Sequence, residues 1–183
     1  MLSVHQSDFQ LIDLAINGDD RAFQHIVERH QRLVATASMN MVGDMDIAQE
    51  IGQQTFIRFY KAMHSFKKEA KLSTYLTRIA INLSLNHLKR KQTFAQRSLD
   101  LSKAINVKAD SDTLDNKQVV HMALQMLDHK HRSVVVLRII QGYSTDETAD
   151  ILEIPKGTVL SRLKRGLEKL KKHLKEDLKY ELS

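Results

Sequence analysis

The residues best suited to chemistry lie in one C-terminal stretch, Lys156-Gly157-Thr158-Val159-Leu160-Ser161-Arg162-Leu163-Lys164-Arg165. Short polar and long cationic side chains of these types can bond to base edges and phosphates in the major groove of DNA. Leucines recur at helical spacing from Leu163 to Leu178, which predicts one apolar stripe with most of the polar groups off it. We interpret the stretch as a DNA-reading helix, against the alternative of a packing helix with a solvated basic face.

The residues before this stretch predict a helix and a tight turn. Ser144 with Glu147 is the pattern of a capping box, in which each side chain bonds a backbone amide of the other residue. Pro155, the only proline, stands where a second helix should begin, and there its missing N–H costs little. We therefore expect a helix-turn-helix over about residues 144–163.

Charge and composition narrow the class of protein. The chain has 183 residues and a net charge of +6, and residues 156–179 alone also carry +6. Concentrated positive charge favours an anionic partner such as nucleic acid. The absence of cysteine excludes disulfides, thiolate zinc sites and thiol catalysis. The first residues lack a signal-peptide pattern, and no apolar run approaches the roughly 20 residues of a membrane span, so we expect a cytoplasmic protein without membrane insertion.

Other chemical arrangements are weaker. There is no Walker loop, nucleophile elbow or His-Glu zinc helix. His25 and His30 are five residues apart and do not share a helix face, and His129 and His131 stand among cations, which disfavours a metal. Acids at 44, 46 and 50 are explained by a helix start. We expect no enzyme, no metal and no cofactor, and a metalloprotein is the weakest alternative.

A second polar surface lies in the N-terminal half. Asparagine is unfavourable inside a helix, so two in register invite an explanation. One explanation is that these side chains hydrogen-bond to base edges while a basic cluster contacts phosphates. The other explanation is an ordinary exposed polar face. The residues follow each other at steps of four, four, three and one: Arg78, Asn82, Asn86, Lys89 and Arg90.

The apolar spacing predicts an all-α protein of two small helical domains joined by a linker, the second being the helix-turn-helix domain. We expect the first domain over residues 7–91, the linker over 92–115 and the second domain over 116–178. The expected boundaries within them are a helix start near Ser7, caps at Asp19-Asp20, Asp46 and Ser73, a charged loop at 65–71 and a turn at 128–131.

Four groups of residues, in order along the chain, resemble the motifs of one family. They are Gly18-Asp19 with Ala22-Phe23; Asp46 with Ala48 to Phe56; Leu76, Arg78 to Ala80, Asn82 and Asn86; and Gly142, Ser144, Glu147, Ala149, Ile154-Pro155, Gly157 to Val159 and Ser161 to Leu163. With these residues and gaps the chain resembles bacterial RNA polymerase sigma factors of the extracytoplasmic-function (ECF) type, the minimal two-domain members of the sigma-70 family.

The resemblance implies a promoter-specificity subunit. It would bind core RNA polymerase through the clamp coiled coil of the largest subunit and through the flap, and it would read the −10 and −35 elements of promoter DNA. An anti-sigma factor is a common further partner in the family. The residues that the resemblance places on polymerase are Asp46, Glu50, Gln53, Gln54 and Phe56.

The same resemblance assigns the DNA contacts. The loop from Phe66 to Lys71 would hold a flipped base, which costs a few kcal/mol of unstacking. The −10 residues are Phe66, Lys68, Tyr75, Arg78, Asn82, Asn86, Lys89 and Arg90. The −35 residues are Arg138, Lys156, Thr158, Ser161, Arg162, Lys164 and Arg165.

The chain departs from the family pattern at several positions. Tyr75 stands where a tryptophan is usual, and Leu160 and Lys164 stand where a cation and an aromatic occur. Gln49 and Gln54 replace acids, and Asp128 replaces a proline. The alternative function is a stand-alone helix-turn-helix regulator that does not bind polymerase. Such a regulator would not need the segment from Asp46 to Phe56.

Overall fold

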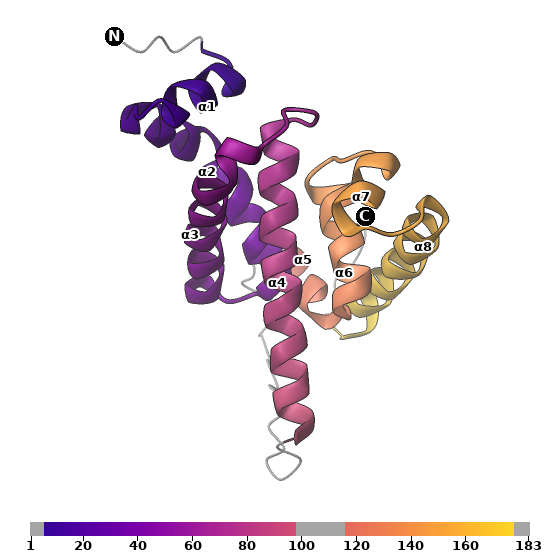
Figure 1. Cartoon of the computed structure of the whole chain (residues 1–183). Helices are drawn as coiled ribbons and strands as arrows, with labels where there is room; N and C mark the ends of the chain where they lie inside the picture. The colour runs from indigo at the N-terminus through magenta and orange to yellow at the C-terminus, as the bar shows by residue number, and fades with distance from the viewer. Residues whose placement is uncertain (1–5, 98–115, 178–183) are drawn as a thin grey trace.

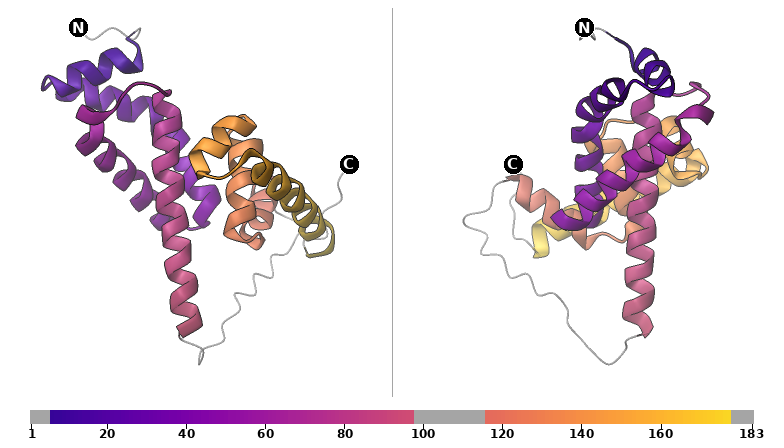
Figure 2. Two further views of the ribbon diagram at one scale, coloured as in Figure 1. Left: turned by 45° about the vertical axis from the view of Figure 1, so that its right-hand side comes forward. Right: turned by 60° about the vertical axis from the view of Figure 1, so that its left-hand side comes forward.

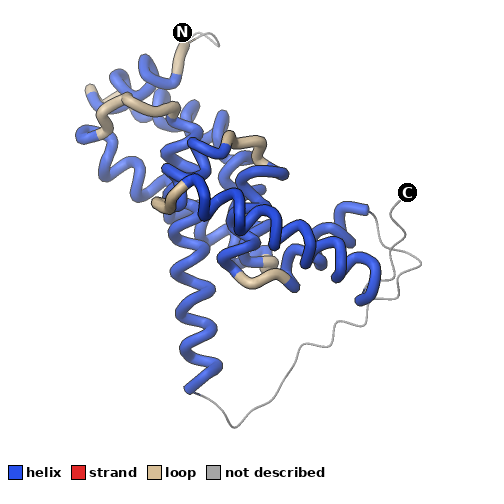
Figure 3. Tube along the Cα trace, turned by 90° about the vertical axis from the view of Figure 1, so that its right-hand side faces the viewer, coloured by secondary structure: helices blue, strands red, loops and turns tan. Residues whose placement is uncertain are grey.

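The structure is a computed structural model that describes residues 6–97 and 116–177, and within these ranges it contains helices and no strand, which confirms the all-α prediction (Figures 1 and 3). The expected linker from residue 98 onward and Leu178 lie outside the described residues. The first half contains α1 (Asp8–Ile16), α2 (Asp20–Val42), α3 (Met45–Ala62), η1 (Met63–Ser65) and α4 (Leu72–Arg97). The second half contains α5 (Asn116–Met126), α6 (His129–Val135), η3 (Val136–Ile140), α7 (Thr145–Leu152), α8 (Lys156–Lys172) and η4 (His173–Asp177).

Side-chain caps start the first three helices. The helix start predicted near Ser7 is confirmed, and Ser7 forms a capping box with Gln10 there. The predicted cap at Asp19 is also confirmed, since its side chain accepts from two amides at the start of α2. The predicted cap of α3 at Asp46 is wrong, because Asp44 Oδ1 accepts from the Ile47 amide at 3.1 Å. Gly43 ends α2 with a φ of 75°, so the chain turns at once and α3 begins one residue after Asp44.

The central helix α4 differs from the expectation at both ends. It begins at Leu72, so Ser73 lies inside its first turn and the predicted cap there is wrong. It also continues to Arg97, beyond the expected end at Lys91, since no glycine or proline interrupts residues 92–97. Its last turns project away from the other helices, as Figure 2 shows, and Phe94 on them is 77% exposed.

In the second half of the chain, some helix starts agree with the prediction from the sequence and others differ. The predicted turn at 128–131 is shorter, because Asp128 caps α6 and His129 is already helical. The capping box of Ser144 and Glu147 is confirmed at the start of α7. Glu153 then adopts a left-handed conformation with a φ of 53°, and Pro155 directly precedes α8. The helix-turn-helix therefore consists of α7 and α8, joined by a tight turn.

Two large apolar cores include residues of α4. In Figure 1, α1 to α3 lie on one side of α4 and α6 to α8 on the other. One core joins α1, α2, α3 and α4 around Leu11, Ile26, Phe59 and Leu76, all essentially inaccessible to solvent. The other crosses between the two halves of the chain. Its buried members come from both halves: Ala37, Met41 and Ile81 from the first, and Leu124, Leu127, Val135, Val136, Leu137, Tyr143 and Ile151 from the second.

Candidate nucleic-acid interface and partner groove

The second helix of the helix-turn-helix, α8, has one buried and one exposed side. Val159 and Gly166 are buried and Leu163 packs on the core. The predicted −35 residues on α8 lie on or beside its outer side: Lys156, Ser161, Lys164 and Arg165 are exposed, and Thr158 and Arg162 are half-buried. The structure therefore brings six of the seven predicted residues onto one helix.

Two of these residues also make local contacts. Ser161 Oγ donates to the Thr158 carbonyl at 3.1 Å, and Lys156 Nζ lies 2.9 Å from Asp146 Oδ1, which ties α8 to α7. The seventh predicted residue, Arg138, lies apart from α8. Its guanidinium donates to the backbone carbonyl of Tyr143, so Arg138 supports the turn between η3 and α7.

The exposed face of α4 carries the second predicted DNA surface. Arg78, Asn82, Asn86, Lys89 and Arg90 are all exposed on this single helix. The stripe expected from their spacing is therefore present. It extends from the middle of the helix toward its projecting end.

The loop before α4 is organised by aromatic packing. The rings of Phe66 and Tyr75 lie 4.9 Å apart between centroids, and Phe59 lies 6.0 Å from each. Both Phe66 and Tyr75 are half-buried against the first core. Lys68 forms an ion pair with Asp13 and has a φ of 58°. The three predicted residues of this loop region are thus held by contacts within the protein.

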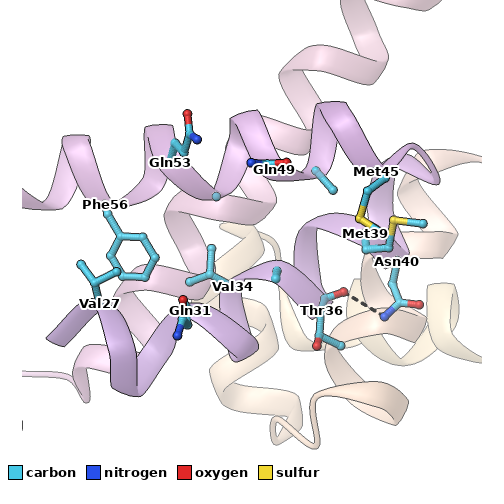
Figure 4. A pocket seen from close by; sticks show the side chains of 13 residues that line it. Val27, Gln31, Val34, Thr36, Met39, Asn40, Met45, Gln49, Gln53 and Phe56 are labelled. Carbon is cyan, nitrogen blue, oxygen red and sulfur yellow. Dashed lines mark hydrogen bonds between the residues drawn. The ribbon is translucent and has the colours of Figure 1, made fainter. Parts of the chain in front are cut away.

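An open groove of about 670 Å³ runs between α2 and α3 (Figure 4). Gln53 and Phe56, two of the five predicted polymerase-binding residues, line it. Asp46, Glu50 and Gln54 are exposed on α3 but do not line it. Most of the apolar walls of this groove were not predicted from the sequence. They include Val27, Val34, Met39 and Met45, and Gln31 and Gln49 add polar groups.

Helix α4 and the helix-turn-helix touch each other. Arg78 forms an ion pair with Glu153 in the turn before α8. Tyr143 Oη lies 2.8 Å from Thr77 Oγ1 in a buried contact and 3.4 Å from the Ser73 carbonyl. Burial raises the pKa of the Tyr143 phenol, so its hydroxyl stays protonated at neutral pH. We call this contact of the two halves, together with the second core, the domain junction.

Replacing Tyr143 with phenylalanine should weaken the domain junction by about 1 kcal/mol, since it removes the phenolic hydroxyl and leaves Thr77 Oγ1 without this partner. Chemical unfolding should show the loss directly. Tyr60→Phe is the matched control, because Tyr60 is exposed on α3. Equal stability of both variants would contradict the role of this hydrogen bond.

Acidification should also weaken the junction through His121 on α5. Burial lowers the pKa of His121 below 6.5, the nearby Arg132 lowers it further, and a hydrogen bond with the Gly43 backbone opposes both. The unfolded chain therefore binds a proton more readily than the folded one. The free energy of unfolding should decline as pH falls below about 6.5, and His121→Gln should reduce this decline. An unchanged pH profile in His121→Gln would contradict the assignment.

Comparisons with known proteins agree with this architecture. The sequence pattern of Sigma-70 region 2 matches residues 26–94, and that of Sigma-70 region 4 matches residues 123–172. The chain is 31% identical over 172 residues to the ECF RNA polymerase sigma factor SigW of Bacillus subtilis, covering 87% of this chain and 92% of the relative. The chain belongs to the ECF sigma factors of the sigma-70 family. The RNA polymerase sigma-H factor of Pseudomonas aeruginosa is a further relative, 28% identical over 182 residues, covering 92% of this chain and 94% of that one.

Solved structures support the same membership. The structure of CnrH in complex with the cytosolic domain of CnrY matches 94% of this sigma factor and 99% of that chain, with a TM-score of 0.70 and 27% identity. The sigma factor RpoE of Bartonella quintana, in complex with the anti-sigma factor NepR, matches with a TM-score of 0.68 and 25% identity, over 85% of this chain and 98% of that one.

Membership decides between the functions considered from the sequence. This sigma factor directs RNA polymerase to promoters, and its partners are core polymerase and promoter DNA. Sigma factors are non-enzymatic initiation factors, so the chain is not an enzyme. The alternative of a regulator that ignores polymerase is set aside. Among the described residues, none of the helices is both long and apolar enough to cross a membrane.

Proposed function

We propose that the groove between α2 and α3 is where this sigma factor docks on the clamp coiled coil of the largest polymerase subunit. The observation that carries this proposal is the groove itself, an open apolar trough with amide side chains. Helical partners bind in such troughs by burying apolar side chains. Asp46, Glu50 and Gln54, exposed beside the groove on α3, would add polar contacts at its edge.

The exposed face of α4 is proposed to bind the −10 element. Arg78, Asn82 and Asn86 would contact bases, and Lys89 and Arg90 would contact phosphates of the same strand. Phe66 and Tyr75 are half-buried members of the aromatic cluster, and an unstacked base would stack on their exposed part. Lys68 would have to leave Asp13 to contact DNA.

The outer face of α8 is proposed to read the −35 duplex. Short polar groups near the start of a second helix fit the major groove, where base edges are distinguishable. Lys164 and Arg165 would neutralise phosphates or contact guanine. Arg138, away from α8, would act through the turn it supports or on the DNA backbone, and the same domain would meet the polymerase flap.

Promoter binding by both halves requires the domain junction to open. The centres of the −35 and −10 elements are about 25 base pairs apart, roughly 80 Å along B-form DNA. In the structure an ion pair joins Arg78 on α4 to Glu153 beside α8. The two proposed faces therefore lie too close to meet both elements at once, and the described arrangement is a closed, unbound form.

An anti-sigma factor that favours this closed form is a proposed partner. CnrH and the Bartonella quintana RpoE were solved with the cytosolic domain of CnrY and with the anti-sigma factor NepR, and this chain shares their arrangement over most of its length. We infer a cytoplasmic location, because core polymerase is the partner. Co-purification from cells, with and without added core enzyme, would reveal such a competitor.

Arg162→Ala should lower affinity for the −35 element by about 1–3 kcal/mol if Arg162 contacts a base. A phosphate contact would instead weaken binding to all sequences alike. Band shifts of holoenzyme on a promoter and on the same promoter with a scrambled −35 element separate the two results. Equal affinity of the wild type for both templates would reject sequence reading by α8.

Run-off transcription with purified core polymerase tests the proposal as a whole. The full chain should bind core enzyme and yield promoter-dependent transcripts. Variants of the α2–α3 groove should lose core binding, whereas variants of α8 should keep core binding and lose promoter selectivity. Variants of the two sites with the same defect would overturn the assignment of separate roles.

A further inference from the structure

Leu160 is a large apolar side chain that the fold does not use. It is 55% exposed and belongs to none of the four apolar clusters found in the described residues. It lies one residue after the buried Val159 and one turn before the exposed Lys164, in the second turn of α8. The residues four positions before and after it, Lys156 and Lys164, are exposed cations, so Leu160 is an apolar side chain on a largely polar part of this face.

Gly157 is a second residue whose type the fold does not require. Its backbone is not in the left-handed region, and a Cβ placed on it would meet nothing within 4 Å. Glycine weakens a helix, so a residue with a side chain would be tolerated and would favour α8. Because Gly157 has no side chain, a base pair or sugar could approach the helix backbone closely one turn before Leu160.

Gly157 and Leu160 therefore place a position without a side chain one turn before an exposed isobutyl group. The N-terminal turns of a recognition helix are the part that approaches base edges in the major groove. There thymine alone presents an apolar group, its C5-methyl, and leucine has no donor or acceptor with which to read any other base. Charged side chains nearby would secure the backbone without competing for that methyl group.

We propose that Leu160 reads the C5-methyl group of a thymine in the −35 element. The inference rests on the proposed −35 face of α8 and adds one base preference to it. It identifies Leu160 as a specificity residue that acts by apolar contact, beside the polar contacts of Ser161 and Lys164. A protein partner that covers Leu160 instead is the competing outcome.

Thymine and deoxyuridine differ only by this methyl group, which allows a direct test. Holoenzyme made from the full chain and core polymerase first selects a promoter from DNA randomised across the −35 element. Each thymine of the selected element is then replaced singly by deoxyuridine. At one position, the wild type should lose about three- to tenfold in affinity, the amount expected for one buried methyl group.

Leu160→Ala should bind the thymine promoter more weakly by a similar factor and should be insensitive to deoxyuridine at that position. Leu167→Ala, also on α8 and 38% exposed, is the matched control and should keep the wild-type response. The proposal is overturned if the selected element contains no thymine, if no deoxyuridine weakens wild-type binding, or if Leu160→Ala responds as the wild type does. The last result, with reduced transcription, would indicate a protein contact.

The test separates this inference from the assignment of α8. Arg162→Ala is measured on the same DNA. If selected and scrambled −35 elements bind wild-type holoenzyme equally and Arg162→Ala changes nothing, the −35 face itself is wrong. If Arg162→Ala weakens binding while deoxyuridine has no effect, the face stands and only the role of Leu160 fails.

Discussion

Combined replacement of Gln53 and Phe56 by alanine should lower the affinity of the sigma factor for core polymerase by roughly 100-fold or more. Both side chains line the α2–α3 groove, and aromatic anchors in such sites often contribute about 2 kcal/mol or more each. Loss of the Gln53 amide would lower the affinity further, in addition to the loss of the Phe56 ring. Titration of labelled sigma factor with core enzyme measures the affinity.

A second variant separates binding from folding, because the Phe56 ring also packs against the first core. Gly52→Glu removes no packing: a Cβ there would meet only Val34 Cγ1, at 4.0 Å, and the longer side chain would place a charge in the groove. It should also abolish tight binding while thermal unfolding changes little. Ile57→Ala, exposed on the same helix and absent from the groove lining, is the control. Normal core binding by Gly52→Glu would exclude the groove as the docking site.

Replacement of Arg132 by methionine should lower the free energy of unfolding by about 3 kcal/mol. Arg132 is buried on α6, and its guanidinium donates to the carbonyls of Gln125 at 2.6 Å and Leu127 at 2.8 Å. It also donates to the carbonyl of Met41, at the end of α2, and to the Gln125 side chain. Methionine fills similar space but leaves these acceptors without their donor, and buried unsatisfied groups are costly.

The size of this effect is limited by the cost of burying a cation. Burial lowers the pKa of Arg132 to about 10, with Asp128 acting in the opposite direction. Because part of the hydrogen-bond energy offsets this desolvation, the net loss is smaller than the number of bonds suggests. Lys130→Met, exposed on the same helix, is the control for the new side chain. Urea unfolding at neutral pH should separate the two variants clearly, and similar midpoints would refute the structural role of Arg132.

Much of the helical layout was predictable because it is local. Ser7, Asp19, Ser144 and Pro155 act within three or four residues of their own positions, and the sequence there determines the structure. The error at the start of α3 arose where two local signals competed. Both Asp44 and Asp46 could begin α3, and the left-handed turn at Gly43 decides for Asp44.

The domain junction was not predictable from the chain alone, because its contacts join residues distant in sequence. Tyr143 meets Thr77, and Arg132 reaches Met41, through no spacing that a single sequence reveals. Gly43 was the one residue in the sequence that could have indicated this junction. Gly43 has a φ of +75°, which favours glycine, and a Cβ on it would lie 2.5 Å from the Gln125 side chain, which would have to shift.

The groove was only half predicted for a related reason. The residues of α3 that resemble a polymerase-binding motif identify one wall, but the other wall comes from α2. Met39 and Met45 have no polar group that would single them out, although Met45 is 68% exposed in the structure. Flexible thioethers suit surfaces that adapt to a partner, and a methionine this exposed is the signal that the structure adds.

The second apolar core has a consequence for how this protein melts. Met41 and Ile81 are fully buried in a core that they share with Leu124 and Leu137 from the other half of the chain. Neither half can lose its fold without exposing apolar surface of the other, so the two sequence regions should share one cooperative transition in the unbound chain. On polymerase, where we propose that the halves separate, the same regions should unfold independently of each other.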